Sequence, residues 1–492
     1  MSLNLISDPW IPVLDADGER RSIAPWQVTG PDLVRPDCPR ADLNVACLEL
    51  LVGLVFLADP PQDEEDWEGR LTPDPDRLRA RLDAFAPAFA LSGDGPLFLQ
   101  DSEPLGGEPK EPDMLFIDSA GDNTAHNNAD LMVHRHRYPT LDPALAAMAL
   151  YTFQAHAPTG GTGNRTSMRG GGPLVTLVDP RTTLWDLIWA NVPCGRPGRM
   201  EDLPWMRPTR VSDKGQETHP PAGAASFGVE AFFGMPRRLR LVWEDGLVTG
   251  VIQKRHGTHY AKWKHPLTPY YRMKPGGEWL PVHPRAGLFG YRHWLGILAE
   301  SSDDSRERAA CLRSWDDRRR AVRTEAKVIV AGWAMDNMKP RDFTLSVQPC
   351  VDLPADAALM LAGLVEAAAE AALVLRGALA PVLAEGESRE AEREAFHAAT
   401  EGAFRDRFDE LKDGAAPADV AKRWLSDLRR RALAQFDALV LPGLDQRDID
   451  VIARIVSARS FLLASFRGHG KHGGAMFDKL MLAKPAKKKG TA

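Results

Sequence analysis

A glycine-rich stretch, residues 157–173 (APTGGTGNRTSMRGGGP), concentrates hydrogen-bond donors. Six glycines fall between Thr159 and Pro173, with hydroxyl, amide and guanidinium side chains among them. Because glycine lacks a side chain, this backbone can approach a polar surface closely, and the neighbouring donors suit an anionic partner. The pattern predicts a contact loop, with an ordinary surface loop as the alternative. The predicted donors are Thr162, Asn164, Arg165, Thr166, Ser167 and Arg169.

This loop lacks the spacing of a nucleotide-binding motif. A P-loop needs GxxxxGK[ST] after a strand, whereas Arg165 stands in place of the lysine and Asn164 precedes it. The segment before the loop reads as a helix, and no βαβ unit surrounds it. We therefore expect neither ATP nor NAD, and no other cofactor.

A second candidate contact loop lies within residues 120–142, which mix amides, histidines and arginines around a short apolar tip. His134 and His136 stand two residues apart, without HExxH or a paired-Asp motif, so we expect polar contacts rather than metal ligands. The alternative is a metal-dependent nucleic-acid enzyme that uses His134, His136 and Asp130.

Two further stretches have suitable chemistry for nucleic acid. Residues 254–274 interleave basic and aromatic side chains, which suit a phosphate backbone and its bases, although ordinary surface loops share this composition. Residues 327–349 form two β-rich runs around DNMKPRD, so a hairpin is predicted with an amide, a thioether and cations at its tip. A solvated hairpin tip is the alternative. The tip residues are Asp336, Asn337, Met338, Lys339 and Arg341.

Regular elements must position these loops. An N-terminal hairpin is predicted within residues 3–28, and a strand pair within 236–254. Apolar helices are predicted over 43–57, 144–155 and 182–192, the second leading directly into the glycine-rich stretch. Residues 58–75 read as an exposed loop, followed by a helix that ends by Ala86.

The character of the chain changes near Asp352. Alanine and leucine become frequent, and helices are predicted over 354–379, 388–412, 417–441 and 447–467. The third helix carries an apolar stripe from Val420 to Leu439, and the fourth carries one that comprises Ile452, Val456, Leu463 and Phe466. The predicted fold is α+β: a large mixed N-terminal domain (1–351), a C-terminal four-helix bundle (352–480) and a basic, disordered tail (481–492).

Charge and cysteine content limit the class of protein. The net charge is −6, yet residues 415–492 hold 15 Lys and Arg against 7 Asp and Glu, a balance that suits phosphate or another partner. The five cysteines are scattered without a CxxC pair, which fits the reducing cytoplasm. The apolar run 48–58, interrupted by Glu49, is too short to span a bilayer, so no membrane partner is expected.

Six features together resemble the large subunit of the type I-E CRISPR Cascade complex, the CasA family. In chain order they are NLISDPWIPV, NNADLM, the glycine loop with SMRGGGP, WKHPLTP, the DNMK hairpin and the C-terminal bundle. The resemblance implies a non-catalytic subunit that recognises the protospacer-adjacent motif in duplex DNA through the minor groove. It also implies duplex opening, contact with guide RNA, assembly with the backbone and small subunits, and recruitment of a helicase-nuclease.

The resemblance also implies site residues. The groove-binding loop corresponds to Gly160, Gly161, Thr162, Gly163, Asn164 and Arg165, and the groove-reading lysine to Lys254, nine residues before Trp263. The wedge corresponds to Asp336, Asn337 and Met338, with Lys339 beside it; Asn337 replaces a glutamine, and Met338 is bulkier than an alanine that can follow. The guide-handle contact corresponds to Asn128, Leu131, Met132 and His134, with Leu131 or Met132 where an aromatic can occur.

Overall fold

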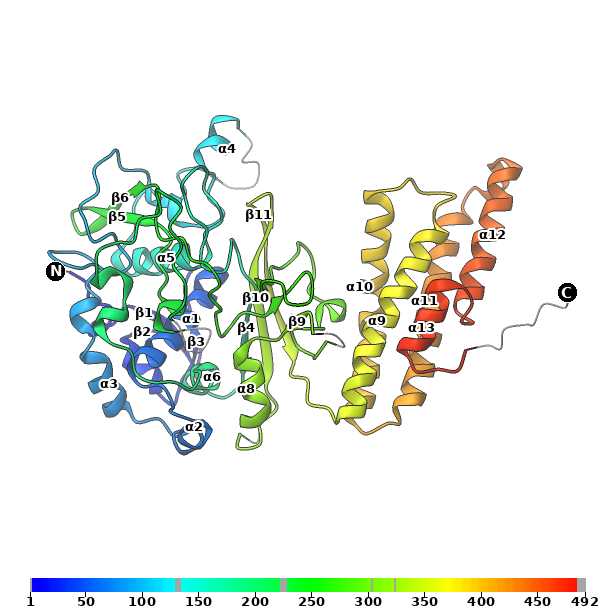
Figure 1. Ribbon diagram of the computed structural model, residues 1–492, viewed down its shortest axis with the longest axis horizontal. Helices are drawn as coiled ribbons and strands as arrows, with labels where there is room; N and C mark the ends of the chain where they lie inside the picture. The colour runs from blue at the N-terminus through cyan, green and yellow to red at the C-terminus, as the bar shows by residue number, and fades with distance from the viewer. Residues whose placement is uncertain (1, 129–133, 222–227, 302–303, 323, 485–492) are drawn as a thin grey trace. The chain divides into compact units, whose positions relative to one another are not determined.

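The computed structural model describes residues 2–128, 134–221, 228–301, 304–322 and 324–484 (Figure 1). Two compact units make up the chain. Unit 1 comprises Met1–Gly287 and Arg308–Cys350, and unit 2 comprises Leu288–Glu307 and Val351–Ala492. The predicted tail, 481–492, lies largely outside the described residues.

Helix α1 (Ala41–Ala58) forms the centre of unit 1, where it contacts α3 (Pro75–Asp83), α5 (Pro143–His156) and α6 (Leu184–Asn191). Its sequence is apolar on every face, as expected for a helix surrounded by protein. The apolar run 48–58 was expected to be too short to span a bilayer. This expectation was wrong, because the helix that contains the run begins at Ala41. By length and composition, α1 and a second helix, α9 (Ala355–Ala378), could cross a membrane, but 89% and 67% of their apolar windows are buried.

Three antiparallel sheets of unit 1 confirm the predicted hairpins. The N-terminal hairpin consists of β1 (Ile11–Asp15) and β2 (Arg20–Ile23), and β3 (Leu33–Pro36) pairs with the other edge of β1. Strands β5 (Arg238–Glu244) and β6 (Leu247–Lys254) form a second sheet. The third has the order β11-β10-β4, with β4 at Val175–Asp179, β10 at Lys327–Asp336 and β11 at Lys339–Pro349.

Several short elements escaped sequence reasoning because they have too few residues for a periodic pattern. One of them, α2 (Glu64–Gly69), lies inside the predicted 58–75 loop, and its N-cap Asp63 accepts a hydrogen bond from the Asp66 amide at 2.9 Å. The others are α4 (Asp122–His126), α7 (Val229–Phe232), α8 (Ala310–Arg318), β7 (Tyr270–Tyr271), β8 (Leu280–Pro281) and β9 (Arg306–Glu307).

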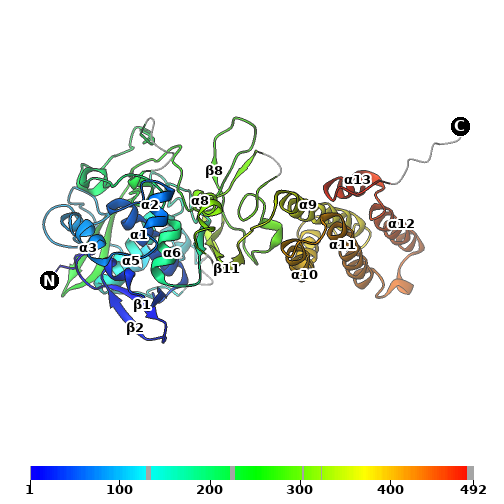
Figure 2. The same cartoon turned by 90° about the horizontal axis from the view of Figure 1, so that it is seen from below.

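Unit 2 is helical, as predicted. Its four long helices are α9, α10 (Glu387–Lys412), α11 (Pro417–Val440) and α12 (Ile449–Ser465), and α9 contacts the other three. A further helix, α13 (Gly470–Lys479), also packs on α9 (Figure 2). Sequence reasoning missed α13 because its glycines lower helix propensity. These glycines allow close packing: a Cβ at Gly473 would lie 2.5 Å from the Ser465 carbonyl oxygen of α12.

Two details of unit 2 differ from the sequence-based expectation. Residues 288–307 belong to this unit, because Tyr291 and Trp294 are buried against Phe404, with ring centroids at 4.3 and 5.2 Å. The predicted stripe of α12 was wrong in part: Val456 is 58% exposed, and Ile455 and Leu462 are buried instead. Apolar residues occur on more than one face of α12, so periodicity alone does not identify the packed face.

Candidate nucleic-acid interface

The glycine-rich stretch divides into an exposed part and a buried part. Thr159 to Thr162 are exposed, and Gly161 (φ +87°) has open space where a Cβ would point. By contrast, a Cβ at Gly171 would lie 2.6 Å from Pro158 Cα, and one at Gly172 only 2.4 Å from the Trp333 carbonyl oxygen of β10. Gly171 and Gly172 therefore allow close backbone packing. Only the exposed part, Thr159 to Thr162, is available to a partner.

A buried charge cluster fixes the second half of this loop. Arg169 Nη1 lies 2.7 Å from Glu49 Oε2, His156 Nε2 lies 2.8 Å from Glu49 Oε1, and His265 Nε2 lies 3.8 Å from Oε2. Burial by itself would raise the pKa of Glu49, but the charges of Arg169 and His156 hold it well below its ordinary value. Burial also lowers the pKa of His265 well below its ordinary value. The expectation that Ser167 and Arg169 are available to a partner was wrong, because both are buried.

Lys254 lies beside the exposed half of the loop. It is the exposed last residue of β6, and hydrogen bonds on both sides of it reach the loop. The His256 amide donates to the Gly163 carbonyl (2.7 Å), and Gln253 Nε2 donates to Asn164 Oδ1 (3.3 Å). The structure therefore brings the backbone around Lys254 beside the glycine loop, while Lys254 Nζ lies 3.8 Å from where a Cβ at Gly107 would be.

The side chains of Asn164 and Arg165 are engaged within the protein. Asn164 Nδ2 donates to the Gly160 carbonyl (2.7 Å), which closes the loop upon itself. Arg165 donates from Nε to Ser212 Oγ and from Nη2 to the Ser212 carbonyl, both at 2.8 Å. These bonds hold the loop in place, so both residues position it.

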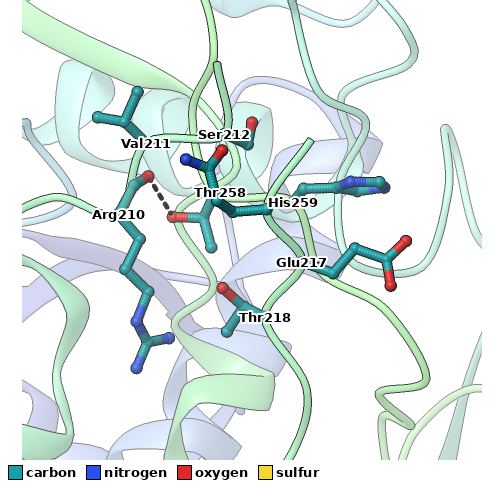
Figure 3. A pocket seen from close by; sticks show the side chains of 8 residues that line it. Arg210, Val211, Ser212, Glu217, Thr218, Thr258 and His259 are labelled. Atoms are coloured by element: carbon teal, nitrogen blue, oxygen red, sulfur yellow. Dashed lines mark hydrogen bonds between the residues drawn. The ribbon is translucent and has the colours of Figure 1, made fainter. Parts of the chain in front are cut away.

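A pocket of about 470 Å³ adjoins this anchor, with Ser212 and His259 among its lining residues (Figure 3). Across it the Thr258 hydroxyl donates to the Arg210 carbonyl at 3.3 Å. The same segments connect to the loop, because the Ser212 amide also donates to the His256 carbonyl (3.0 Å). The pocket wall is therefore part of the support of the glycine loop.

The β10–β11 hairpin ends in a tight turn made of Asn337 and Met338. Both have positive φ, +49° and +62°, as a type I′ turn requires. The predicted wider tip is shorter in the structure because pairing continues to Asp336 and Lys339. Asn337 Nδ2 donates to Asp336 Oδ1 (3.0 Å), Arg341 forms a 2.9 Å ion pair with Asp336, and Met338 is 47% exposed.

The hairpin and the glycine loop share an anchor. Trp333 and Met335 of β10 pack against Gly171 and Gly172, where a Cβ at Gly171 would lie 3.2 Å from Met335 Sδ. The strand that follows the loop, β4, pairs with β10 from Val175 onward. Both candidate contact elements are therefore built on one sheet of unit 1.

The second predicted loop is described only in part. Leu131, Met132 and Asp130 lie outside the described residues. Asn128 (φ +48°) and His134 are exposed, and Arg135 connects them: its Nη2 donates to Asn128 Oδ1 (3.1 Å), and its carbonyl oxygen lies 3.0 Å from His134 Nδ1. His136 Nδ1 lies 2.7 Å from Glu111. Within the described residues, no three His, Cys, Asp or Glu side chains are placed to hold a metal ion.

Sequence reasoning missed several supporting residues. Glu49 had a signal, because a charged side chain inside an apolar helix is buried only when it is paired. Ser212 and a buried arginine, Arg237, had none, since their contacts depend on loops that meet only in the folded chain. His256 lies in the predicted 254–274 stretch, but its backbone contact with Gly163 was not predicted.

Comparisons with known proteins agree with this architecture. A family model described as "CRISPR-associated protein Cse1 (CRISPR_cse1)" matches residues 4–435. No curated protein matches the chain by sequence. CasA (Cse1) from Thermus thermophilus is similar in structure, with TM-score 0.72, 20% identity, and coverage of 94% of this chain and 98% of that one.

Two other solved structures share the fold. Cse1 from Thermobifida fusca has TM-score 0.70, 19% identity, and coverage of 97% of this chain and 98% of its own. A chain of a CRISPR RNA-guided surveillance complex has TM-score 0.67, 16% identity, and coverage of 94% and 99%. Because the family model covers most of the sequence and the fold agrees throughout, this chain belongs to the Cse1 family of CRISPR-associated proteins.

Proposed function

We propose that this chain is the non-catalytic large subunit of an RNA-guided type I-E Cascade complex in the cytoplasm. Its task is to recognise the protospacer-adjacent motif in duplex DNA and to open the duplex beside it. The family match and the structural likeness to a chain of a surveillance complex support this role. Base pairing between the guide RNA and the target strand then recognises the long target sequence, while the protein recognises only the short motif in the duplex.

The observation that carries the proposal is the attachment of Lys254 to the glycine loop. Hydrogen bonds from Gln253 and His256 join the segment that carries Lys254 to Gly163 and Asn164. The Lys254 ammonium lies on the side of Gly107, where a Cβ would be 3.8 Å from Nζ. A minor groove about 6 Å wide admits a backbone without side chains, and a lysine ammonium can donate to the acceptors on its floor. Since the minor-groove code is degenerate, we expect several related motifs to be accepted.

The Asn337–Met338 turn is the proposed wedge. Inserting it costs a few kcal/mol of unstacking per base step, which contacts to the exposed bases and the growing heteroduplex offset. The ion pair between Asp336 and Arg341 stiffens the turn, and Lys339 adds a cation for the phosphate backbone.

Other partners follow from the family role. Asn128 and His134, with Leu131 and Met132 of the same loop, are the proposed guide-handle contact. The backbone and small subunits are the proposed assembly partners, and a helicase-nuclease is recruited after strand opening.

The test is reconstitution with guide RNA and the other subunits, followed by R-loop formation on a motif-bearing plasmid. Lys254→Ala is expected to lower R-loop formation by roughly tenfold. The control is Lys412→Ala, which removes an exposed lysine at the end of α10 and is expected to leave R-loop formation unchanged. Normal R-loop formation by both Lys254→Ala and Asn337→Ala would contradict the proposed role in motif recognition and duplex opening.

The alternative is a metal-dependent nucleic-acid enzyme that uses Asp130, His134 and His136. It predicts that the isolated protein cleaves DNA or RNA with Mg²⁺ or Mn²⁺ and that His136→Ala abolishes the cleavage. Our proposal predicts no cleavage by either protein.

A further inference from the structure

A buried arginine lies directly beneath the exposed part of the glycine loop. Arg237 is only 3% exposed, and its Nη2 donates to the Pro158 carbonyl. Its guanidinium also stacks over the Phe153 ring, 5.2 Å from the centroid. A Cβ at Gly160 would lie 2.7 Å from Arg237 Nη1, so the cation packs against the glycine itself.

The charge of Arg237 is not neutralised by a carboxylate in the described part of the chain, and its Nε has no hydrogen-bond partner there. Burial lowers the pKa of Arg237 to about 10. Two equally buried arginines behave differently: Arg169 pairs with Glu49 at 2.7 Å, and Arg318 pairs with Glu64 at 2.6 Å. Because an unpaired buried cation costs free energy, an anion at this position would stabilise the protein.

The backbone above Arg237 has free donors. Across the described residues, the N–H groups of Gly160, Gly161 and Thr162 make no hydrogen bond to the protein. Consecutive backbone N–H groups form concavities that bind anions. The exposed Arg255 adds positive charge beside the loop, since its Cβ lies 3.1 Å from where a Cβ at Gly163 would be.

We propose that Gly160, Gly161 and Thr162, with Arg237 beneath them, form a binding site for one phosphodiester of duplex DNA. Arg237 is a positioning residue: it holds Pro158 and Gly160 and supplies the compensating charge without touching the ligand. The inference rests on the proposed function, because it takes the duplex as ligand. A phosphate contact fixes orientation but reads no sequence, so losing it should weaken all duplexes equally.

The test compares Arg237→Gln and Arg237→Lys in the reconstituted complex. Affinity is measured for motif-bearing and motif-free duplexes from about 50 to about 300 mM KCl, after thermal melting shows that both variants fold. Arg237→Gln is expected to weaken both duplexes by roughly threefold to tenfold and to make the salt dependence shallower by about one unit of slope. Arg237→Lys is expected to keep the slope, as is Arg181→Gln, which removes an exposed arginine elsewhere in unit 1.

An unchanged slope in Arg237→Gln, or the same slope change in Arg237→Lys as in Arg237→Gln, would overturn the phosphate site and leave Arg237 as a structural support. Defective guide assembly with normal DNA affinity would also overturn it, because the phosphate would then belong to RNA. A wild-type complex that does not distinguish the motif would contradict the proposed function separately, since the slopes on motif-free duplex still decide the phosphate site.

Discussion

Gly161 carries the sharpest prediction for a single residue. Its φ of +87° makes any side chain strained, yet a Cβ there would point into open space. Gly18, in the β1–β2 turn, has the same properties at φ +82°. Alanine at either position should cost about 1–2 kcal/mol of stability.

We expect Gly161→Ala and Gly18→Ala to lower the melting temperature by similar amounts. Only Gly161→Ala should weaken binding of motif-bearing duplex, because only its methyl group would occupy the space reserved for the groove. Equal DNA affinity of the two variants would show that the glycine loop is an ordinary surface loop.

The two residues of the β10–β11 turn, Asn337 and Met338, can be replaced without disturbing the backbone of the turn. Glycine tolerates positive φ, so Asn337→Gly and Met338→Gly keep the type I′ conformation while they remove the amide and the thioether. Both variants should slow strand opening severalfold, as measured by 2-aminopurine fluorescence next to the motif. Asp245→Gly, in the equivalent two-residue turn between β5 and β6, is the matched control and should open DNA at the wild-type rate.

At the scale of elements, the Glu49 cluster connects α1, α5, the glycine loop and the segment around His265. Glu49→Gln leaves Arg169 buried and unpaired, and should reduce the free energy of unfolding by about 3–5 kcal/mol. Arg169→Met should also be destabilising, because it removes the arginine partner of the buried Glu49 and leaves only His156 and His265 beside it. Urea unfolding of the double variant should show a loss well below the sum of the two single losses. Additive losses would show that the cluster does not act as a unit.

The long periodic elements could be predicted from the sequence, and the supports of the site could not. The alternation of apolar and polar residues predicted the β10–β11 and β5–β6 hairpins. Helical periodicity predicted the ends of α9, α10 and α11 to within a few residues. The glycine loop was recognised by composition, but its division into exposed and buried halves depends on Trp333 and Glu49, which are remote in sequence. No local pattern encodes such contacts.

At the scale of the whole molecule, acid should destabilise unit 2. Burial lowers the pKa of His397 to about 4, and the charges of Arg292 and Arg393 act in the same direction. Between pH 6.5 and 4 the unfolded chain therefore binds a proton that the folded chain does not, so stability falls as the pH falls. The expected loss is about 3 kcal/mol across this interval.

The matched variant is His397→Gln, which cannot titrate and should show a shallower pH dependence of urea unfolding. His265 in unit 1 has its pKa lowered by burial in the same way, so some acid sensitivity should remain in the variant. An unchanged pH profile in His397→Gln would contradict the account of this histidine.

The central claim is that the glycine loop and Lys254 recognise DNA from the minor groove, and modified bases test it most directly. Inosine in place of a motif guanine removes only the minor-groove amino group, and 7-deazaguanine removes only the major-groove N7. We predict that inosine changes the affinity of the wild-type complex, that 7-deazaguanine does not, and that Lys254→Ala reduces the effect of inosine. Sensitivity to 7-deazaguanine with indifference to inosine would contradict the claim.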